Sequence, residues 1–302
     1  MVDGGSPATP ILDWFNVFTA SIFVFFTAWI SHSIGLRLGF PLIISSIRCV
    51  LQLTLMGFVL DDVLHVNNIK PVMLITVTLV LLGSYETVYH RTRRTLKGLF
   101  PIIFLVLLIS NGVVCYLGVT LALNESPFWR PVTFIPVMGM LLGNSMGSIA
   151  MATGVCVDSI TIHAPVIETR LSYGASRYEA VKTLAVQAIR VSMLPALTQL
   201  SVMGMINIPG MMTGQILAGM RVQEAVIYQE VIMFMVSASC GFGVLLTVCA
   251  CMVLLVDSHH AIRKDRIIEA HPEFIRIICR QIYFGIQWLI RSCSQTTRRH
   301  HE

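Results

Sequence analysis

The amino-acid sequence predicts an all-α integral membrane protein with seven transmembrane helices. Three observations support this fold class. The 302-residue chain is 55% hydrophobic and only 12% charged, whereas soluble domains carry about 25% charged residues. The few charges leave long apolar runs between them, each close to or above the roughly 20 residues that a membrane-spanning helix needs. Lys and Arg also gather on one side of these runs, as they do in the inner loops of membrane proteins.

The seven predicted spans follow from where charges are missing. Two apolar runs hold one formally charged residue each, Arg48 in 38–60 and Glu86 in 71–90. Five runs hold no Asp, Glu, Lys or Arg at all: 14–36, 98–124, 131–157, 191–220 and 231–256. The chain therefore divides into a short N-terminus (1–13), a seven-helix transmembrane domain (14–256) and a basic tail (257–302).

The distribution of basic residues predicts that the N-terminus lies outside and the C-terminus inside. With this orientation, 17 of the 21 Lys and Arg residues fall in inner segments, namely 32–40, 91–98, 154–190 and the tail. Inner basic loops that face anionic lipid explain the net charge of +5, so a nucleic-acid partner is not expected. Within the tail, residues 274–290 mix Arg with Ile, Phe and Trp, which favours a helix lying at the inner interface.

The inner segment 154–190 is the only long connection, and its sequence predicts two helices. Pro165 suits a helix start, with Glu168 in the first turn, and Gly174 ends that helix. A second helical run, 176–189, leads into the sixth span. We therefore expect a short helix, a turn and an ascending helix.

Several polar residues lie inside the predicted spans. Arg48 and Gln52 share one face of the second span, and Glu86 lies near the inner end of the third. Because an unpaired charge in lipid is costly, we expect Arg48 and Glu86 to pair, either as part of a gate or as a structural clasp. Amides and an acid lie in other spans, where they either bond between helices or line a polar cavity: Asn111, Asn144, Gln199, Gln229 and Glu230.

The stretch NIPGMMTGQILAG, residues 207–219, interrupts the apolar pattern after the sixth span. Irregular backbone near membrane depth needs protein around it or a cavity beside it. Two interpretations stay open, a re-entrant or outer-gate element and a tight outer turn held by its own bonds. The residues that would form the element are Pro209, Gly210, Thr213, Gly214 and Gln215.

Catalytic and metal-binding patterns do not stand out in the sequence. It has no GxxxxGK[ST] phosphate loop, no Ser/His/Asp arrangement and no zinc-ligand spacing, so we expect neither an enzyme nor a directly bound cofactor or metal. The 16 methionines could form a soft-metal path, but methionine as adaptable core filler is the favoured explanation.

Three stretches make the sequence resemble a known family: IPVMGMLLGNSMGSIA (135–150), ETRLSYGASRYEAV (168–181) and IPGMMTGQILAG (208–219). They are similar to the UPF0014 family of FetB-type ABC transporter permeases, over about residues 11–266, and a eukaryotic member is expected. The resemblance implies a permease subunit that works as a homodimer in the bilayer with a separate ABC ATPase, which alone would bind ATP. Glu168, Gly174 and Ala175 match the E-x5-G-A core of the coupling motif that docks on the ATPase.

The resemblance leaves the substrate and the membrane of residence open. Relatives are linked to iron export and metal homeostasis, and others to nucleotide-sugar transport. Two alternatives from other classes are a seven-helix receptor and a stand-alone secondary carrier. The sequence lacks the receptor elements Asp-Arg-Tyr and Asn-Pro-x-x-Tyr, and it shows no inverted repeat of the kind that carriers contain.

Overall fold

The computed structural model describes residues 13–36, 38–65, 69–92, 94–96, 98–255 and 267–269. The chain divides into two compact units, which we describe separately. The described part of the first unit lies within residues 1–76, 118–136 and 202–232, and that of the second within 77–117, 137–201 and 233–302. The predicted interfacial helix at 274–290 and most of the N-terminal and tail segments lie outside the described residues.

The predicted all-α class with seven transmembrane helices is confirmed. Within the described ranges, seven helical segments are long and apolar enough to cross a membrane. They are α1 (Trp14–Ser33), α2 (Gly39–His65), α3 (Ile69–Glu86) with the π-turn η1 (Thr87–Arg91), α4 (Leu99–Leu117) with η2 (Gly118–Ala122), α5 (Pro131–Ile162), α7 (Arg177–Val202) and α9 (Val222–Leu255). Two shorter helices, α6 (Ala164–Ser172) and α8 (Gly210–Leu217), lie between the last three spans.

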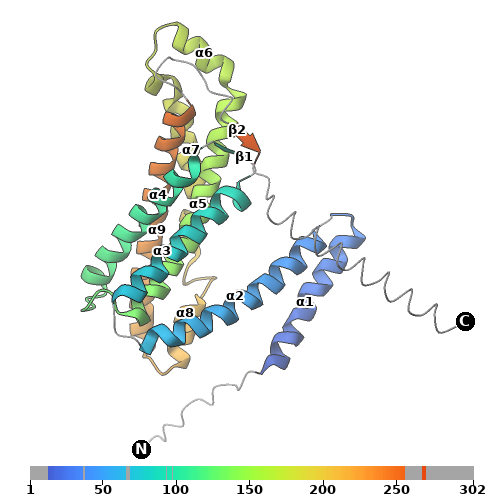
Figure 1. Cartoon of the computed structure of the whole chain (residues 1–302), viewed down its shortest axis with the longest axis vertical. Coiled ribbons are helices and arrows are strands. Elements are labelled where there is room, and N and C mark those ends of the chain that lie inside the picture. The colour runs from blue at the N-terminus through green and yellow to red at the C-terminus, as the bar shows by residue number, and fades with distance from the viewer. Residues whose placement is uncertain are drawn as a thin grey trace, which may run out of the picture. The chain divides into compact units, whose positions relative to one another are not determined.

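In the first unit, α1 and α2 form a helical hairpin, drawn in blue in Figure 1. The turn starts where Gly35 adopts a φ of +77°, a conformation that glycine accepts without strain. The Ser31 hydroxyl then accepts a hydrogen bond from the backbone N–H of Leu38 at 3.2 Å. At Gly39 the helices are so close that an added Cβ would lie 2.9 Å from the Ala28 carbonyl oxygen. Glycine is therefore what lets the two backbones meet.

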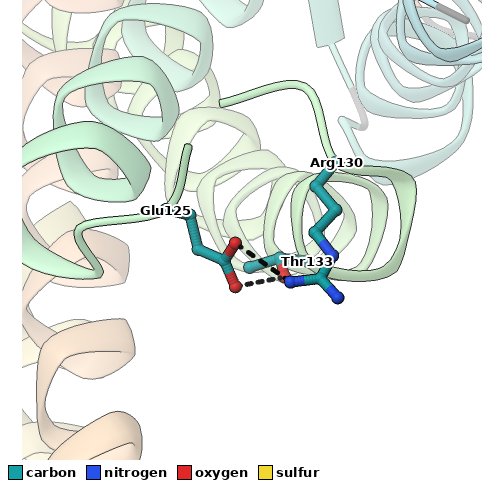
Figure 2. Close-up of polar contacts among 3 residues, drawn as sticks. All are labelled: Glu125, Arg130 and Thr133. Atoms are coloured by element: carbon teal, nitrogen blue, oxygen red, sulfur yellow. Dashed lines mark hydrogen bonds and ion pairs between the residues drawn. The ribbon is translucent and has the colours of Figure 1, made fainter. Parts of the chain in front are cut away.

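The loop before α5 is held by a polar clasp in the first unit, shown in Figure 2. The Glu125 carboxylate accepts a hydrogen bond from the Thr133 hydroxyl at 3.3 Å and pairs with the Arg130 guanidinium at 3.4 Å. Thr133 lies in the first turn of α5, so the carboxylate also lies near the positive end of that helix dipole. The clasp fixes where α5 begins.

The interruption after the sixth span is larger than the sequence predicts. The charge-free run reaches residue 220, but α7 ends at Val202 and α9 already begins at Val222. Met203 bridges to Asn207, and Gly204, with a φ of +86°, donates its N–H to the Asn207 carbonyl. Pro209 then caps α8, because its fixed φ suits the position before a helix.

The second unit is built around α5. An added Cβ on Gly83 of α3 would lie 3.1 Å from Leu142, and one on Gly243 of α9 would lie 2.9 Å from Ile149, both residues of α5. The core of this unit contains fully buried apolar side chains from three helices, among them Ile103 and Leu107 of α4, Leu141 and Ile149 of α5, and Val244 of α9. The sequence predicted neither the π-turns η1 and η2 nor the small antiparallel ladder that β1 (Arg94–Leu96) forms with β2 (Ile267–Glu269).

The predicted helix, turn and ascending helix within 154–190 are present. Helix α6 ends at Ser172, and the chain turns at Gly174, whose φ is +91°. The N–H of Ala175 bonds to the Arg170 carbonyl at 3.1 Å. Helix α7 then starts with a reciprocal capping box: Ser176 donates to the Glu179 carboxylate at 2.7 Å, and the N–H of Glu179 bonds back at 3.3 Å. Figure 1 shows α6 between the ends of α5 and α7.

One detail of α6 was predicted wrongly. The helix begins at Ala164, with His163 as its N-cap, so Pro165 is its second residue. Glu168 is consequently its fifth residue and lies beyond the first turn. The cause is the bond from the N–H of Ile167 to the His163 carbonyl, which starts the helix before the proline.

Candidate functional site

A buried polar cluster joins three helices of the second unit. Asn111 of α4 is completely buried, and its side-chain oxygen accepts hydrogen bonds from Ser145 of α5, at 3.1 Å, and from Ser239 of α9. Its amide nitrogen donates to the Leu107 carbonyl at 2.9 Å. An asparagine oxygen has two lone pairs, so both are used here. The cluster ties α4, α5 and α9 together at one point.

A small cavity lies beside this cluster in the second unit, and we call it the amide cavity. Its volume is about 230 Å³, and its lining includes Asn144, Gly147, Ser148, Met151, Gln199 and Cys240. Asn144 donates to the Met140 carbonyl at 2.9 Å, which leaves its side-chain oxygen available to the cavity. Pro195 also lines the cavity and removes the N–H that would otherwise bond the Val191 carbonyl. The cavity therefore presents uncharged polar groups.

A larger cavity of about 690 Å³ lies farther along α5, and we call it the basic cavity. Its charged residues are Arg91 at the end of η1, Arg94 in β1 and Asp158 in α5. Arg94 and Asp158 form an ion pair at 3.5 Å. Arg91 lies over the α5 backbone, since an added Cβ on Gly147 would be 3.4 Å from its Nη1 atom.

The two cavities share one face of α5. Gly147 and Met151 line both of them, with Asn144 on one side and Gly154 and Asp158 on the other. These positions recur every third or fourth residue, which is the spacing of a single helix face. With 32 residues, α5 is about 48 Å long, well beyond the roughly 30 Å of a hydrocarbon core. One continuous helix face thus runs from uncharged amides to paired charges.

The other residues predicted to lie in the pathway or to couple with an ATPase are distributed over both units. Arg48 and Gln52 are exposed on α2 in the first unit, whereas Glu86 is half-buried at the end of α3 in the second. The predicted pairing of Arg48 with Glu86 therefore stays a prediction. Glu168 is exposed on α6, and Ala175 is half-buried just after Gly174.

The predicted gate residues lie in and beside α8 in the first unit. The Thr213 hydroxyl donates to the Pro209 carbonyl at 3.3 Å, and no α8 residue is buried. Gly210 and Gly214 face open space, because a Cβ added to either would meet no heavy atom within 4 Å. Two amide oxygens, of Gln215 and of Gln229 in α9, are buried without a hydrogen-bond partner. Glu230, next to Gln229, is exposed.

Sequence reasoning missed four residues that the structure brings to these sites. Ser145 and Ser239 were not singled out, because serine is common in apolar helices. Asp158 could have been found as the charge that ends the run 131–157, and Arg91 was counted only as an inner basic residue. In the part of the chain that the structure describes, no three His, Cys, Asp or Glu side chains are placed to hold a metal ion.

Comparison with known proteins decides the family. Residues 14–255 match the model of the family described as Uncharacterised protein family UPF0014. The chain belongs to the UPF0014 family. No solved structure matches this UPF0014 protein, but its relatives and its seven apolar helices identify it as a multi-pass integral membrane protein.

Relatives of this UPF0014 protein come from bacteria and plants. It is 31% identical over 202 residues to the UPF0014 membrane protein slr1647 of Synechocystis sp., covering 67% of this chain and 78% of the relative. It is 32% identical over 216 residues to Protein ALUMINUM SENSITIVE 3 of Arabidopsis thaliana, covering 72% and 77%. It is 27% identical over 228 residues to the Probable iron export permease protein FetB of Escherichia coli, covering 74% and 83%.

Proposed function

We propose that this UPF0014 protein is the permease subunit of an ABC transporter, which moves a small solute across a membrane with energy from a separate ATPase. The observation that carries the proposal is the arrangement of α6, the turn at Gly174 and α7. A short, well-ended helix between two long membrane helices is the kind of rigid lever that can transmit motion from a partner. The naming of the Escherichia coli relative as a probable iron export permease supports a transport role.

The proposed arrangement keeps the N-terminus outside and the C-terminus inside, so α6 faces the cytosol with Arg170 and Lys182 nearby. Two copies of the chain would assemble with two ATPase chains, and Glu168, Gly174 and Ala175 would form the docking element. ATP would bind the partner only. The name of the Escherichia coli relative supports a role in metal homeostasis, such as the export of iron.

Co-purification tests this proposal. The full chain, extracted from its native membrane, should retain an ABC ATPase, and Gly174→Val should release it because valine is strained at a φ of +91°. Gly35→Val is the matched control, since Gly35 also has a positive φ but lies in the α1–α2 turn. ATP-independent solute movement in vesicles by the isolated chain would contradict the proposal, as would equal ATPase retention in the two variants.

We propose further that the interruption between α7 and α9 shapes the outer end of the pathway. A Cβ added to Gly210 or Gly214 meets no described heavy atom within 4 Å, so these substitutions should be tolerated by the fold and act on the pathway. Gly210→Val or Gly214→Val should therefore abolish transport while the amount of folded protein stays the same. Transport at the wild-type rate in both variants would show that the segment is only a connecting turn.

A further inference from the structure

The charge balance of the basic cavity favours anions. Arg94 and Asp158 compensate each other through their ion pair. Arg91 is exposed to the cavity and makes no hydrogen bond or ion pair with any residue in the described ranges. Among the described lining residues, this leaves one positive charge without a paired carboxylate and a planar set of donors, which matches the oxygens of phosphate or carboxylate groups.

The same lining disfavours a bare metal cation. Among the described residues that line the basic cavity, Asp158 is the only acidic one, and it is already paired with Arg94. Hard cations need several oxygen ligands, most of them anionic. The described residues also place no group of three metal-ligating side chains anywhere in the fold. Arg91 would repel a cation at the place where an anion would be held.

We propose that the basic cavity is the entry site for a small solute that carries a phosphate or carboxylate group, and that the shared α5 face is its route. This inference rests on the proposed transport function, and it narrows the solute, because iron would enter this site only as an anionic complex and not as the bare ion. Arg91 binds the anionic group, with Arg94 beside it at the rim. The uncharged part of the solute then reaches the amide cavity, where Asn144 and Gln199 supply hydrogen bonds.

Gly147 lies where the linings of the two cavities meet. It lines both cavities, and an added Cβ would already lie 3.4 Å from the Arg91 guanidinium, at ordinary contact distance. A leucine here would extend further and occupy the space in which Arg91 meets its ligand. Met151, which is 41% exposed and also lines both cavities, is a flexible side chain that can move aside at the same level.

Binding of radiolabelled inorganic pyrophosphate tests the site without any ATPase. The full chain is placed in nanodiscs of phosphatidylcholine, and saturable binding is measured for three chains. We expect wild type to bind, Arg91→Gln to bind at least tenfold more weakly, and Arg190→Gln to stay within twofold of wild type. Arg190 is an exposed arginine of α7 that lines neither cavity, so its variant removes the same charge elsewhere.

A second pair of variants tests the position of Gly147 on the proposed route. Gly147→Leu should abolish pyrophosphate binding, and Gly143→Leu should leave it unchanged, because Gly143 lies one turn earlier on α5 and has no atoms near its added Cβ. The thermal midpoint of each variant reports its folding. If Arg91→Gln does not fold, Arg91→Lys replaces it, and a loss of binding beyond threefold is expected because lysine lacks the planar fork.

A phospholipid headgroup carries the same chemistry, and the nanodisc composition separates the two sources. Phosphatidylglycerol is added, and the lipid retained by each purified chain is counted by mass spectrometry. Retention that depends on Arg91, without pyrophosphate binding, would make this a lipid site and overturn the proposal. Equal pyrophosphate binding by Arg91→Gln and Arg190→Gln would overturn it too. Since no ATPase is present, failure here leaves the co-purification result independent.

Discussion

The α1–α2 hairpin and helix α5 have nearly the same hydropathy but use their apolar side chains in different ways. In the spans of α1 and α2, 11% and 0% of the residues are buried within the chain, against 61% in that of α5. The difference lies in the small and polar residues. Helix α5 carries Ser145, Gly147 and Ser148 along its length, so neighbouring helices can approach it closely and bond to it.

This contrast shows what an apolar span does and does not reveal. Aromatic side chains such as Phe18, Phe23 and Trp29 project from α1 and are well suited to lipid or to a partner chain. Hydropathy predicts that such a helix enters a membrane, but it does not predict which neighbour the helix meets. Substitutions in the second unit should therefore cost much more stability than matched substitutions in the first.

The largest expected effect is at Asn111. Asn111→Leu would leave the buried Ser145 and Ser239 hydroxyls without their shared acceptor. We expect the free energy of unfolding, measured by denaturation in detergent, to fall by about 2 kcal/mol, toward the upper end for bonds between membrane helices. Gln52→Leu on the exposed face of α2 should change it by less than about 0.5 kcal/mol. Similar losses in both variants would remove the contrast between the units.

The second-largest effect on stability is expected at the close contact between α9 and α5. Gly243→Val would place its Cβ 2.9 Å from the end of the Ile149 side chain. Ile149 can shift in part, so we expect a loss of about 1–2 kcal/mol from overpacking in the same unfolding measurement. Gly57→Val on α2, where an added Cβ meets nothing within 4 Å, is the control. An unchanged Gly243→Val variant would mean that the two helices pack less tightly than described.

The capping box at the start of α7 should give an intermediate effect. Ser176→Ala removes the bonds that Ser176 exchanges with Glu179, and we expect a loss of about 1 kcal/mol. Ser172→Ala is the control, because the Ser172 hydroxyl bonds only to a carbonyl of its own helix. Hydrogen exchange of the first-turn amides of α7 measures the local effect. Equal exchange in the two variants would exclude a capping role.

The smallest effect is expected at the clasp of the first unit. Arg130→Gln removes an ion pair in which the arginine side chain is 58% exposed, and such pairs contribute less than about 1 kcal/mol. The stability difference from wild type should shrink further in 1 M salt, where the Debye length is about 3 Å. A loss as large as that of Asn111→Leu would show that the first unit depends on its polar contacts as strongly as the second.

The sequence was sufficient for the features that depend on local patterns. Apolar runs with at most one charge gave the correct number of spans, although the sixth span starts at Arg177 and not at residue 191. Pro165 with Gly174 located the short helix and turn between α5 and α7. Helix boundaries were predicted less accurately where glycine or proline ends a helix inside an apolar run. The run to residue 220 hid the end of α7 at Val202, because Gly204 and Pro209 interrupt the helix without adding any charge.

The candidate site was predicted only in part, because its residues come together from distant segments. Asn144 and Gln199 were identified as amides inside spans, but their shared cavity depends on how α5 and α7 pack. Arg91 belongs to a turn that the sequence marks only as basic, and its position over Gly147 requires the path of η1. No spacing rule links a residue at 91 to one at 147.

Both cavities are bounded by the part of α5 that follows Pro136, a stretch without proline, and this has a mechanical consequence. A helix whose hydrogen bonds are unbroken turns as a rigid screw, so any twist about its long axis carries Asn144 and Asp158 round together. Widening at one level is then geometrically tied to narrowing or reshaping at the other. Under the proposed transport function, a roll of this one helix would reshape both cavities at once.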